Sequence, residues 1–240
     1  MMLPSPPLPA PGAALFLDFD GTLAPIASDP DAVFLPKGGA EILRALSAKL
    51  GGALAILSGR DIRDLAKRVP EDLWRAGGHG LEVCAPGEAP EDFANAAPPA
   101  LVDALTMIAA GVEGARLELK GEVLALHYRA APEAGSALKA AMEKVIAGAD
   151  GYILQPGKMV LEAKPAHANK GITLTRFLER RPFAGLTPVM AGDDATDEDA
   201  MAEAISAGGY GVKVGPGESK AAYGIEDPAA VWRWLEAAAQ

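Results

Sequence analysis

Apolar and polar positions are arranged along the chain in blocks that predict strands and helices in turn. Near-continuous apolar runs that end in polar residues cover Ala13–Phe19, Ala53–Leu57 and Thr187–Ala191. Runs of this kind are typical of strands buried on both faces of a parallel sheet. Helical patterns follow them over Gly39–Leu50, Asp61–Val69 and Thr196–Ala207. The alternation predicts an α/β domain with a Rossmann-like parallel sheet.

The middle of the chain has a different pattern, which predicts an inserted α+β segment. The expected strands are Arg116–Leu119, Val123–Tyr128, Tyr152–Gln155 and Met159–Ala163, and the expected helices are Pro99–Ala110 and Pro132–Ala147. We therefore expect a core formed by residues 13–80 and 166–240, and an α+β domain over residues 81–165. The acidic, proline-rich stretch 85–99 is expected to include a loop. The proline-rich residues 1–12 predict a disordered tail outside the fold.

Composition narrows the possible partners. The chain has 240 residues, 50% of them hydrophobic, and a net charge of −10. That charge argues against nucleic acid and anionic membranes, but a small phosphorylated substrate needs only a local cationic pocket. The single cysteine, Cys84, excludes an intramolecular disulfide and is expected to be a small residue in a strand. With no basic leader before Lys37, we expect a cytoplasmic protein; its oligomeric state is left open and a monomer is compatible.

Acidic residues follow the first apolar run directly, in the string Asp18-Phe19-Asp20-Gly21-Thr22. Asp18 and Asp20 are two residues apart, so their side chains lean the same way in an extended backbone. One can act as a nucleophile, while the other protonates a leaving oxygen and then activates water. The alternative is a solvated turn with a helix N-cap, and the strand in front favours the catalytic interpretation.

Polar residues also follow the other two apolar runs. Ser58, Gly59 and Arg60 come after the second run, and Asp193 and Asp194 come after the third. Because ligands of parallel sheets bind at the carboxyl ends of the strands, we expect these residues around one mouth, together with the aspartates of the first run. Four carboxylates there would repel one another, and a hard divalent cation such as Mg²⁺ would relieve the repulsion.

Two more strings could bind phosphate or balance charge. Ser58 and the helix start behind it can bind a phosphoryl group, although Ser-Gly is also an ordinary N-cap. Lys170, in the string NKG, could neutralise a phosphoryl group or the nucleophile, or it could be solvated. The string GDDATDED could be an acidic first helical turn that suits the helix dipole. That alternative explains Asp197–Asp199 better than it explains Asp193 and Asp194.

The strings DFDGT, LSGR, NKG and GDD stand in this order, and together they resemble the haloacid dehalogenase (HAD) superfamily of phosphatases. Finer strings from Asp18 to Ala200 are similar to the trehalose-6-phosphate phosphatase family: DFDGTLAPIASDPD, AGGHGLE, ELKGEVLALHYRAAP, QPGKMVLEAKPAHANKG and GDDATDEDA. Gly78 and Ala166–Ala168 lie where relatives vary. The resemblance implies an HAD core with an inserted α+β cap that selects the substrate. It also implies Mg²⁺-dependent hydrolysis of trehalose 6-phosphate through an aspartyl-phosphate, in trehalose biosynthesis.

The same resemblance implies roles for individual core residues. The nucleophile and the general acid–base are implied at Asp18 and Asp20. The implied phosphate-binding residues are Ser58, Gly59 and Lys170. The implied Mg²⁺ ligands are Asp18, the backbone carbonyl of Asp20, Asp193 and, through water, Asp194.

Sugar-binding residues are also implied, most of them in the cap. They are Arg60, His79, Glu118, Lys120, His127, Arg129, Lys158 and Glu162. A two-residue period would place Glu118 with Lys120, His127 with Arg129, and Lys158 with Glu162 on shared strand faces. An ordinary solvated outer face is the alternative.

Other activities fit the same strings. The chain could act on another sugar phosphate or glycoside phosphate, or it could be a mutase that returns the phosphoryl group to a sugar. From a different class, it could be a phosphosugar sensor without catalysis. Loss of Asp18 or Asp20 would indicate such a sensor, and both residues are present.

Overall fold

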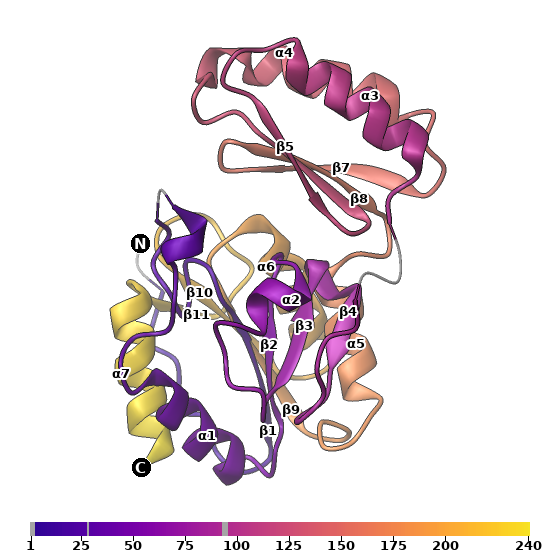
Figure 1. The fold of residues 1–240 in the computed structure, drawn as a ribbon. Coiled ribbons are helices and arrows are strands. Elements are labelled where there is room, and N and C mark those ends of the chain that lie inside the picture. The colour runs from indigo at the N-terminus through magenta and orange to yellow at the C-terminus, as the bar shows by residue number, and fades with distance from the viewer. Residues whose placement is uncertain (1–2, 28, 93–95) are drawn as a thin grey trace. The chain divides into compact units, whose positions relative to one another are not determined.

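The computed structural model describes residues 3–27, 29–92 and 96–240. The chain divides into two compact units, Met1–Pro90 with Asn169–Gln240, and Glu91–Ala168. Figure 1 shows the second unit as an insertion between two segments of the first. None of the helices in the described residues has the length and apolar character that crossing a bilayer requires.

The first unit is a seven-stranded sheet with helices on both faces (Figure 1). Its strands are β1 Ala13–Asp18, β2 Leu54–Leu57, β3 Trp74–Gly77, β4 Glu82–Cys84, β9 Thr187–Gly192, β10 Tyr210–Val214 and β11 Tyr223–Ile225. Its helices are α1 Gly39–Lys49, α2 Ile62–Leu65, α5 Lys170–Leu178, α6 Ala195–Ser206 and α7 Pro228–Ala239, with single 3-10 turns η1 Pro30–Ala32 and η2 Gly78–Gly80. The strand order is β11-β10-β9-β1-β2-β3-β4, parallel except for β4. The predicted parallel α/β sheet is therefore confirmed.

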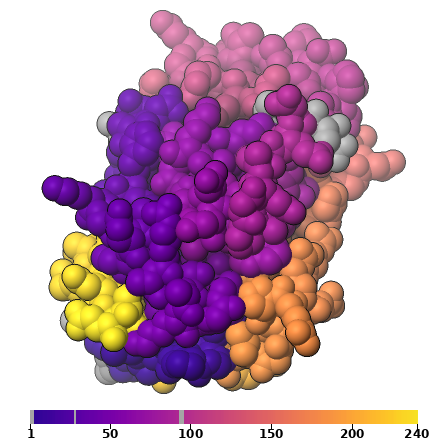
Figure 2. Space-filling model, turned by 60° about the horizontal axis from the view of Figure 1, so that its bottom comes forward, coloured from indigo at the N-terminus to yellow at the C-terminus, as the bar shows by residue number. Residues whose placement is uncertain are grey.

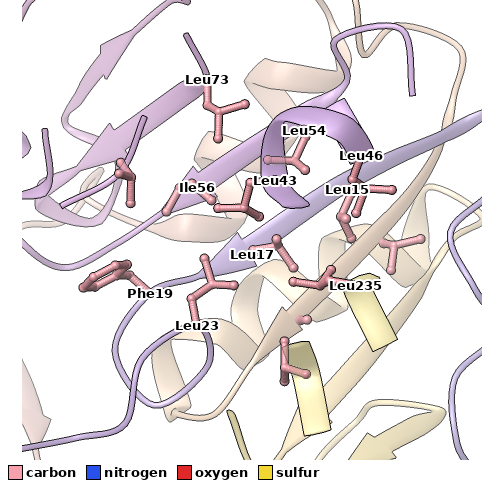
Figure 3. Close-up of a cluster of buried hydrophobic side chains, with 14 of the residues drawn as sticks. Leu15, Leu17, Phe19, Leu23, Leu43, Leu46, Leu54, Ile56, Leu73 and Leu235 are labelled. Carbon is pink, nitrogen blue, oxygen red and sulfur yellow. The ribbon is translucent and has the colours of Figure 1, made fainter. Parts of the chain in front are cut away.

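Alternate residues of β1 supply two separate cores, as expected for a strand buried on both faces. Leu15 and Leu17 belong to the cluster that α1 and α7 cover, and Figure 3 shows them beside Leu43 and Leu235. Phe16 lies in the second cluster, against α5 and α6. Each buried leucine stabilises the fold by about 1.5–3 kcal/mol relative to an exposed one, so β1 is firmly held. Figure 2 shows the yellow C-terminal helix α7 at the surface, beside the N-terminal residues that include α1.

The second unit is a four-stranded antiparallel sheet with two helices on one face. Its strands are β5 Arg116–Lys120, β6 Val123–His127, β7 Tyr152–Gly157 and β8 Val160–Pro165, in the order β5-β6-β8-β7. Its helices are α3 Pro99–Ala110 and α4 Gly135–Ile146, which a 3-10 turn, η3 Pro132–Ala134, precedes. The predicted α+β segment has this architecture. Residues 93–95 of the predicted loop lie outside the described residues.

Two predicted boundaries differ from the structure. The core extends to Pro90 rather than to residue 80, because β4 pairs antiparallel with β3, as in Ala76 opposite Val83. The return to the core comes at Asn169 rather than at residue 166, because β8 runs on to Pro165 and the next helix starts at Lys170.

The proline-rich N-terminal segment is not separate from the fold in its described part, residues 3–12. The backbone carbonyl of Pro4 accepts a hydrogen bond from the amide of Gly224 at 2.9 Å, and that of Pro7 accepts one from the Trp234 indole at 2.9 Å. Pro9 is buried. Proline has no amide hydrogen but keeps its carbonyl, so this segment acts as an acceptor along the edge of the core. Met1 and Met2 lie outside the described residues.

Candidate active site

Asp18 lies at the carboxyl end of the central strand β1, where the strand order along the chain reverses. β1 pairs with β2 on one side and with β9 on the other, so β2 to β4 are added toward one edge of the sheet and β9 to β11 toward the other. Such a switch point is where open α/β sheets bind ligands. The Asp18 side chain is only 5% exposed. The predicted convergence of the strand ends of β1, β2 and β9 is present.

The turn after β1 brings that strand end against β9. The amides of Leu23 and Ala24 both donate to the Phe19 carbonyl, at 3.0 and 2.9 Å. Gly21 has a φ of +87°, and a Cβ there would lie 2.2 Å from an oxygen of the Asp193 carboxylate. The position therefore requires glycine both for its backbone and for the close approach of Asp193.

Lys170 is the positive centre of the site. It follows the N-cap residue Asn169 at the start of α5, and its ammonium group donates to Asp18 Oδ1 and to Asp197 Oδ1, each at 2.7 Å. Lys170, Asp18 and Asp197 are all buried. A desolvated lysine needs such paired acceptors, so the three side chains form one ionic unit.

Asp197 was not predicted as a site residue, and its position shows why it belongs there. Its Oδ2 accepts the backbone amides of Asp193 and Asp194 at 3.0 and 3.1 Å, while its Oδ1 accepts from Lys170. Asp194, in contrast, is the N-cap of α6, and its Oδ1 accepts from Thr196 N at 2.8 Å and Oγ1 at 2.7 Å. The Asp-x-x-Asp spacing indicates the capping box of α6, but it does not indicate the contact of Asp197 with Lys170.

Burial and mutual repulsion raise the pKa values of the carboxylates beside β1. The pKa of Asp18 lies well above its usual range, because burial and then Asp197 oppose its charge more strongly than Lys170 favours it. Burial followed by Asp197 and Asp194 raises the pKa of Asp193 to about 7. Burial alone would lower the pKa of Lys170, but Asp18 and Asp197 outweigh it and hold that pKa well above the usual value. The site therefore carries more negative charge than one lysine balances.

The same residues fit a hard divalent cation. Oxygens from Asp18, Asp193 and Asp197 lie within 4.8 Å of one another. The second oxygen of Asp18 is buried and has no hydrogen-bond partner in the described part of the chain. An all-carboxylate donor set with an orphaned oxygen and excess negative charge suits Mg²⁺ or a similar ion. Asp194, predicted as a ligand through water, caps α6 through its Oδ1.

Ser58 and Gly59 follow β2 and lie beside the turn that contains His79. The Ser58 carbonyl accepts the His79 amide at 3.0 Å, and the Ser58 hydroxyl accepts the Arg60 amide at 3.1 Å. A Cβ on Gly59 would lie 2.7 Å from the His79 ring. His79 itself is buried and has a φ of +58°, a conformation that non-glycine residues adopt rarely. The structure thus packs His79 against the predicted phosphate loop, in the first unit.

Arg60 forms a forked ion pair with Asp20. Its Nε donates to Asp20 Oδ2 and its Nη2 donates to Asp20 Oδ1, both at 2.6 Å. On the opposite side, Nη1 donates to Asp64 Oδ2 at 2.8 Å. Burial would lower the pKa of Arg60, but these two carboxylates outweigh it and raise the pKa above its usual value.

The second unit carries a row of polar side chains on the sheet face that its helices leave uncovered. Across the strands, Glu118 is opposite Ala125, Ala125 is opposite Glu162, and Glu162 is opposite Gln155. The opposite face packs Leu117, Leu126 and Leu161 against α3 and α4. The predicted shared face of Glu118 and Lys120 agrees with this arrangement.

Ion pairs join the side chains of this row. His127 Nε2 lies 2.7 Å from Glu118 Oε2, and Lys120 lies 3.7 Å from both Glu118 and Glu162. The hydrogen bond from His127 lowers the pKa of Glu118, against the opposing effect of burial. Charged side chains of both signs on one face can form hydrogen bonds with several hydroxyl groups at once.

Two predicted strand residues of this face lie in turns instead. Lys158 is in the β7–β8 turn, next to Met159, whose φ is +62°. The strand resumes only at Val160, so the two-residue period does not extend back to Lys158. Arg129 is exposed in the turn after β6, which ends at His127. Turn formation overrides a strand period at both positions.

Comparison with known proteins identifies the family of this chain. The sequence model of the trehalose-phosphatase family matches residues 16–227. The chain is 38% identical over 234 residues to a trehalose-6-phosphate phosphatase of Escherichia coli K12, covering 93% of this chain and 85% of that protein. It is 41% identical over 208 residues to a probable trehalose-phosphate phosphatase of Sinorhizobium fredii, covering 85% and 78%. The solved C-terminal domain of the C. albicans trehalose-6-phosphate phosphatase superposes with a TM-score of 0.80 at 23% identity, covering 95% and 91%.

The fold and the site together define the class. The parallel sheet with an inserted α+β unit is the fold of the haloacid dehalogenase (HAD)-like hydrolases, and Asp18 at the end of β1 contacts a buried lysine. One such hydrolase, from Bacteroides thetaiotaomicron, superposes with a TM-score of 0.66 at 18% identity, covering 93% of this chain and 98% of that one. Within that class, the chain belongs to the trehalose-phosphatase family. It is a phosphoric monoester hydrolase.

Proposed function

We propose that this chain hydrolyses trehalose 6-phosphate to trehalose and inorganic phosphate, through a phosphorylated Asp18. Family membership supports the substrate and its place in trehalose biosynthesis. The observation that carries the chemistry is the buried Lys170 that bridges Asp18 and Asp197 at the end of β1.

Asp18 is the nucleophile in this proposal. In the first half-reaction a carboxylate oxygen of Asp18 bonds to phosphorus and the bond between phosphorus and the sugar oxygen breaks, while Asp20 gives its proton to that oxygen. In the second, a water oxygen bonds to phosphorus, the Asp18–phosphorus bond breaks and Asp20 takes the proton from water. The burial of Asp18 favours this role, because a poorly hydrated carboxylate attacks without first losing a water shell.

Ser58, Gly59 and Lys170 bind the phosphoryl group. The ammonium of Lys170 can neutralise charge on the phosphoryl oxygens, and the Ser58 hydroxyl and the Gly59 amide can donate to them. The contact of His79 with Gly59 supports this loop from behind. His79 is thus a support for the phosphate site in this proposal.

The divalent cation that the family implies is Mg²⁺ in our proposal. Asp18, Asp193 and Asp197 would hold it, with the backbone carbonyl of Asp20 as a further oxygen ligand. When bound, the ion neutralises charge on the transferring phosphoryl group.

The polar sheet face of the second unit recognises the sugar. Glu118, Lys120, His127 and Glu162 offer donors and acceptors on one surface, which suits a polyhydroxylated disaccharide. Arg129 and Lys158 would contribute from the turns beside it. We propose no nucleic-acid or membrane partner, given the net charge of −10, and a cytoplasmic location, which one unpaired cysteine fits.

A phosphate-release assay over a panel of sugar phosphates, with and without Mg²⁺, tests the proposal. We expect trehalose 6-phosphate to have the highest kcat/KM and activity to require the metal. Higher activity on another sugar phosphate would reassign the substrate. Transfer of the phosphoryl group to a sugar without phosphate release would identify a mutase, and no turnover of any substrate would identify a sensor.

A further inference from the structure

Both carboxylate oxygens of Asp20 are occupied by one side chain, that of Arg60. The two N–H···O distances of 2.6 Å are short even for charge-assisted bonds, and the two parallel bonds match the fork of a guanidinium to the fork of a carboxylate. Asp20 is also the residue that must reach the leaving oxygen in the proposed reaction. Each of these oxygens keeps a second acceptor position, so the Arg60 fork fixes the orientation in which Asp20 can exchange a proton.

Arg60 is itself fixed from the side opposite Asp20. Asp64 accepts from Arg60 Nη1 at 2.8 Å, and Pro30 O accepts from Nη2 at 3.1 Å. Arg68 holds Asp64 in turn, with bonds of 2.9 and 2.6 Å, and stacks on Phe34 at 4.9 Å. The Arg60 side chain is only 10% exposed. It is therefore a built-in part of the first unit rather than a side chain extended toward a ligand.

We propose that Arg60 is a positioning residue for Asp20: its two bonds hold the plane of the carboxylate so that Asp20 faces the reacting oxygen during turnover. This inference rests on the proposed phosphatase function and changes the predicted role of Arg60 from sugar contact to support of the general acid–base. Lysine cannot replace it, because an ammonium is a point charge and cannot hold both oxygens in one plane.

The two half-reactions separate this role from phosphate binding. An aryl phosphate whose phenol is acidic releases the phenolate without needing a proton. Such a substrate therefore phosphorylates Asp18 without help from Asp20. Hydrolysis of the phosphoenzyme still needs Asp20 to activate water. A defect that acts through Asp20 therefore keeps the first burst of phenol and slows the steady state.

The experiment compares wild type, Arg60→Lys, Asp20→Asn and the double variant, all with Mg²⁺. We expect Arg60→Lys to lower kcat/KM for trehalose 6-phosphate about ten- to a hundred-fold, with a burst of p-nitrophenol within about twofold of wild type. In the Asp20→Asn background, Arg60→Lys should have no further effect, since residues that act as a unit are not additive.

Two further variants guard against a folding defect. Asp64→Asn removes the anchor behind Arg60 and should give the same pattern at smaller size, about threefold, because the Asp20 contact itself remains. Arg44→Lys is the matched control, since Arg44 Nε contacts both oxygens of Asp72 at 3.0 and 2.9 Å on the exposed surface. It should leave every rate unchanged.

The outcomes are distinct. Loss of the burst, or additive losses in the double variant, would overturn the positioning role and assign Arg60 to the phosphoryl site or to the fold. If wild type turns over trehalose 6-phosphate and Arg60→Lys has the same kinetics as wild type, only this inference is overturned. A wild-type enzyme with no turnover overturns the proposed function and this inference with it.

Discussion

The two units use charged side chains in opposite ways. In the first, Asp18, Lys170 and Asp197 are buried at the end of β1 and hold one another in short ion pairs. In the second, Glu118 and Glu162 lie on an open sheet face, with side chains 37% and 12% exposed, and their contacts to Lys120 are 3.7 Å long. The first site has more negative charge than Lys170 balances, and the second pairs partly exposed side chains, most closely His127 with Glu118 at 2.7 Å.

Sheet type explains this difference. Helices cover both faces of the parallel sheet, so its strands have apolar residues on both sides and polar chemistry is confined to the strand ends. The antiparallel sheet is covered on one face only, so alternate residues of its strands can carry recognition. The proposed phosphoryl chemistry, which needs desolvated charge, therefore fits the first unit, and the proposed sugar contacts fit the second.

The largest expected effect is in the first unit. Asp18→Asn should lower kcat at least about a thousand-fold on both trehalose 6-phosphate and an aryl phosphate, because an amide cannot attack phosphorus. Phosphate release measures the loss. Asp72→Asn, which changes an exposed aspartate of the same unit, is the matched control and should keep wild-type rates. Near-normal turnover by Asp18→Asn would exclude the covalent route.

Removal of metal should abolish turnover of both substrates as well. Activity should vanish in a chelator and return with Mg²⁺, whereas Ca²⁺ should restore little, since it accepts more ligands in looser geometry. A second readout is thermal: Mg²⁺ should raise the Tm of wild type, but not that of Asp193→Asn. Full activity of enzyme shown to be metal-free by elemental analysis would contradict the cation site.

Stability should distinguish a buried lysine from a partly exposed one. Lys170→Met leaves Asp18 and Asp197 buried without their cation, which should destabilise the metal-free first unit by about 3 kcal/mol. Lys120→Met should destabilise the second unit by less than about 1 kcal/mol. All three tryptophans lie in the first unit, so urea unfolding followed by fluorescence reports on it and far-UV circular dichroism on both. Equal losses of unfolding free energy in the two variants would contradict the expected difference between the units.

A substitution on the polar sheet face of the second unit should lower selectivity for trehalose 6-phosphate over a small aryl phosphate. Glu162→Ala should lower kcat/KM for trehalose 6-phosphate about ten- to a hundred-fold, because a hydrogen bond to a charged group is worth about 1.5–3 kcal/mol. Turnover of a small aryl phosphate should change little. The control is Lys139→Ala, on an exposed helix surface of the same unit. If both substrates lost equally, Glu162 would serve the fold or the phosphate site rather than the sugar.

Much of the fold could be predicted from local patterns. Three apolar runs identified β1, β2 and β9 because strands buried on both faces are continuous in sequence. The antiparallel edge strand β4 has only three residues, two of them half-buried, and such a strand leaves no pattern to detect. α2 stops after Leu65 rather than at Val69, because the amides of Lys67 and Arg68 bond back three residues instead of four.

The position of a candidate site residue was predictable where it directly follows an apolar run, as for Asp18 at the end of β1. It was not predictable where tertiary contacts decide between neighbours. Asp194 and Asp197 both fit an acidic first turn, and only the contact with Lys170 from α5 selects Asp197. Arg60 likewise has partners 40 and 30 residues away, in Asp20 and Pro30, which no local pattern could pair with it.

The smallest expected effect concerns acid stability, which tests whether each unit's ion pairs matter in the same way. Burial alone would raise the pKa of Asp64 in the first unit, but hydrogen bonds from Arg68 and Arg60 lower it below its ordinary 3.8. A hydrogen bond from His127 lowers the pKa of Glu118 in the second unit below its ordinary 4.5. A carboxyl whose folded pKa is depressed stabilises the fold above its ordinary value, and this contribution is lost as pH falls from there through the folded pKa. Asp64→Asn should therefore flatten the decline of tryptophan-monitored stability below about pH 4. Glu118→Gln should flatten the decline monitored by circular dichroism. Each change should be less than about 1 kcal/mol, because both groups are partly solvated. An acid limb that neither substitution changes would assign acid sensitivity to other carboxyl groups and leave these two ion pairs without a role in stability.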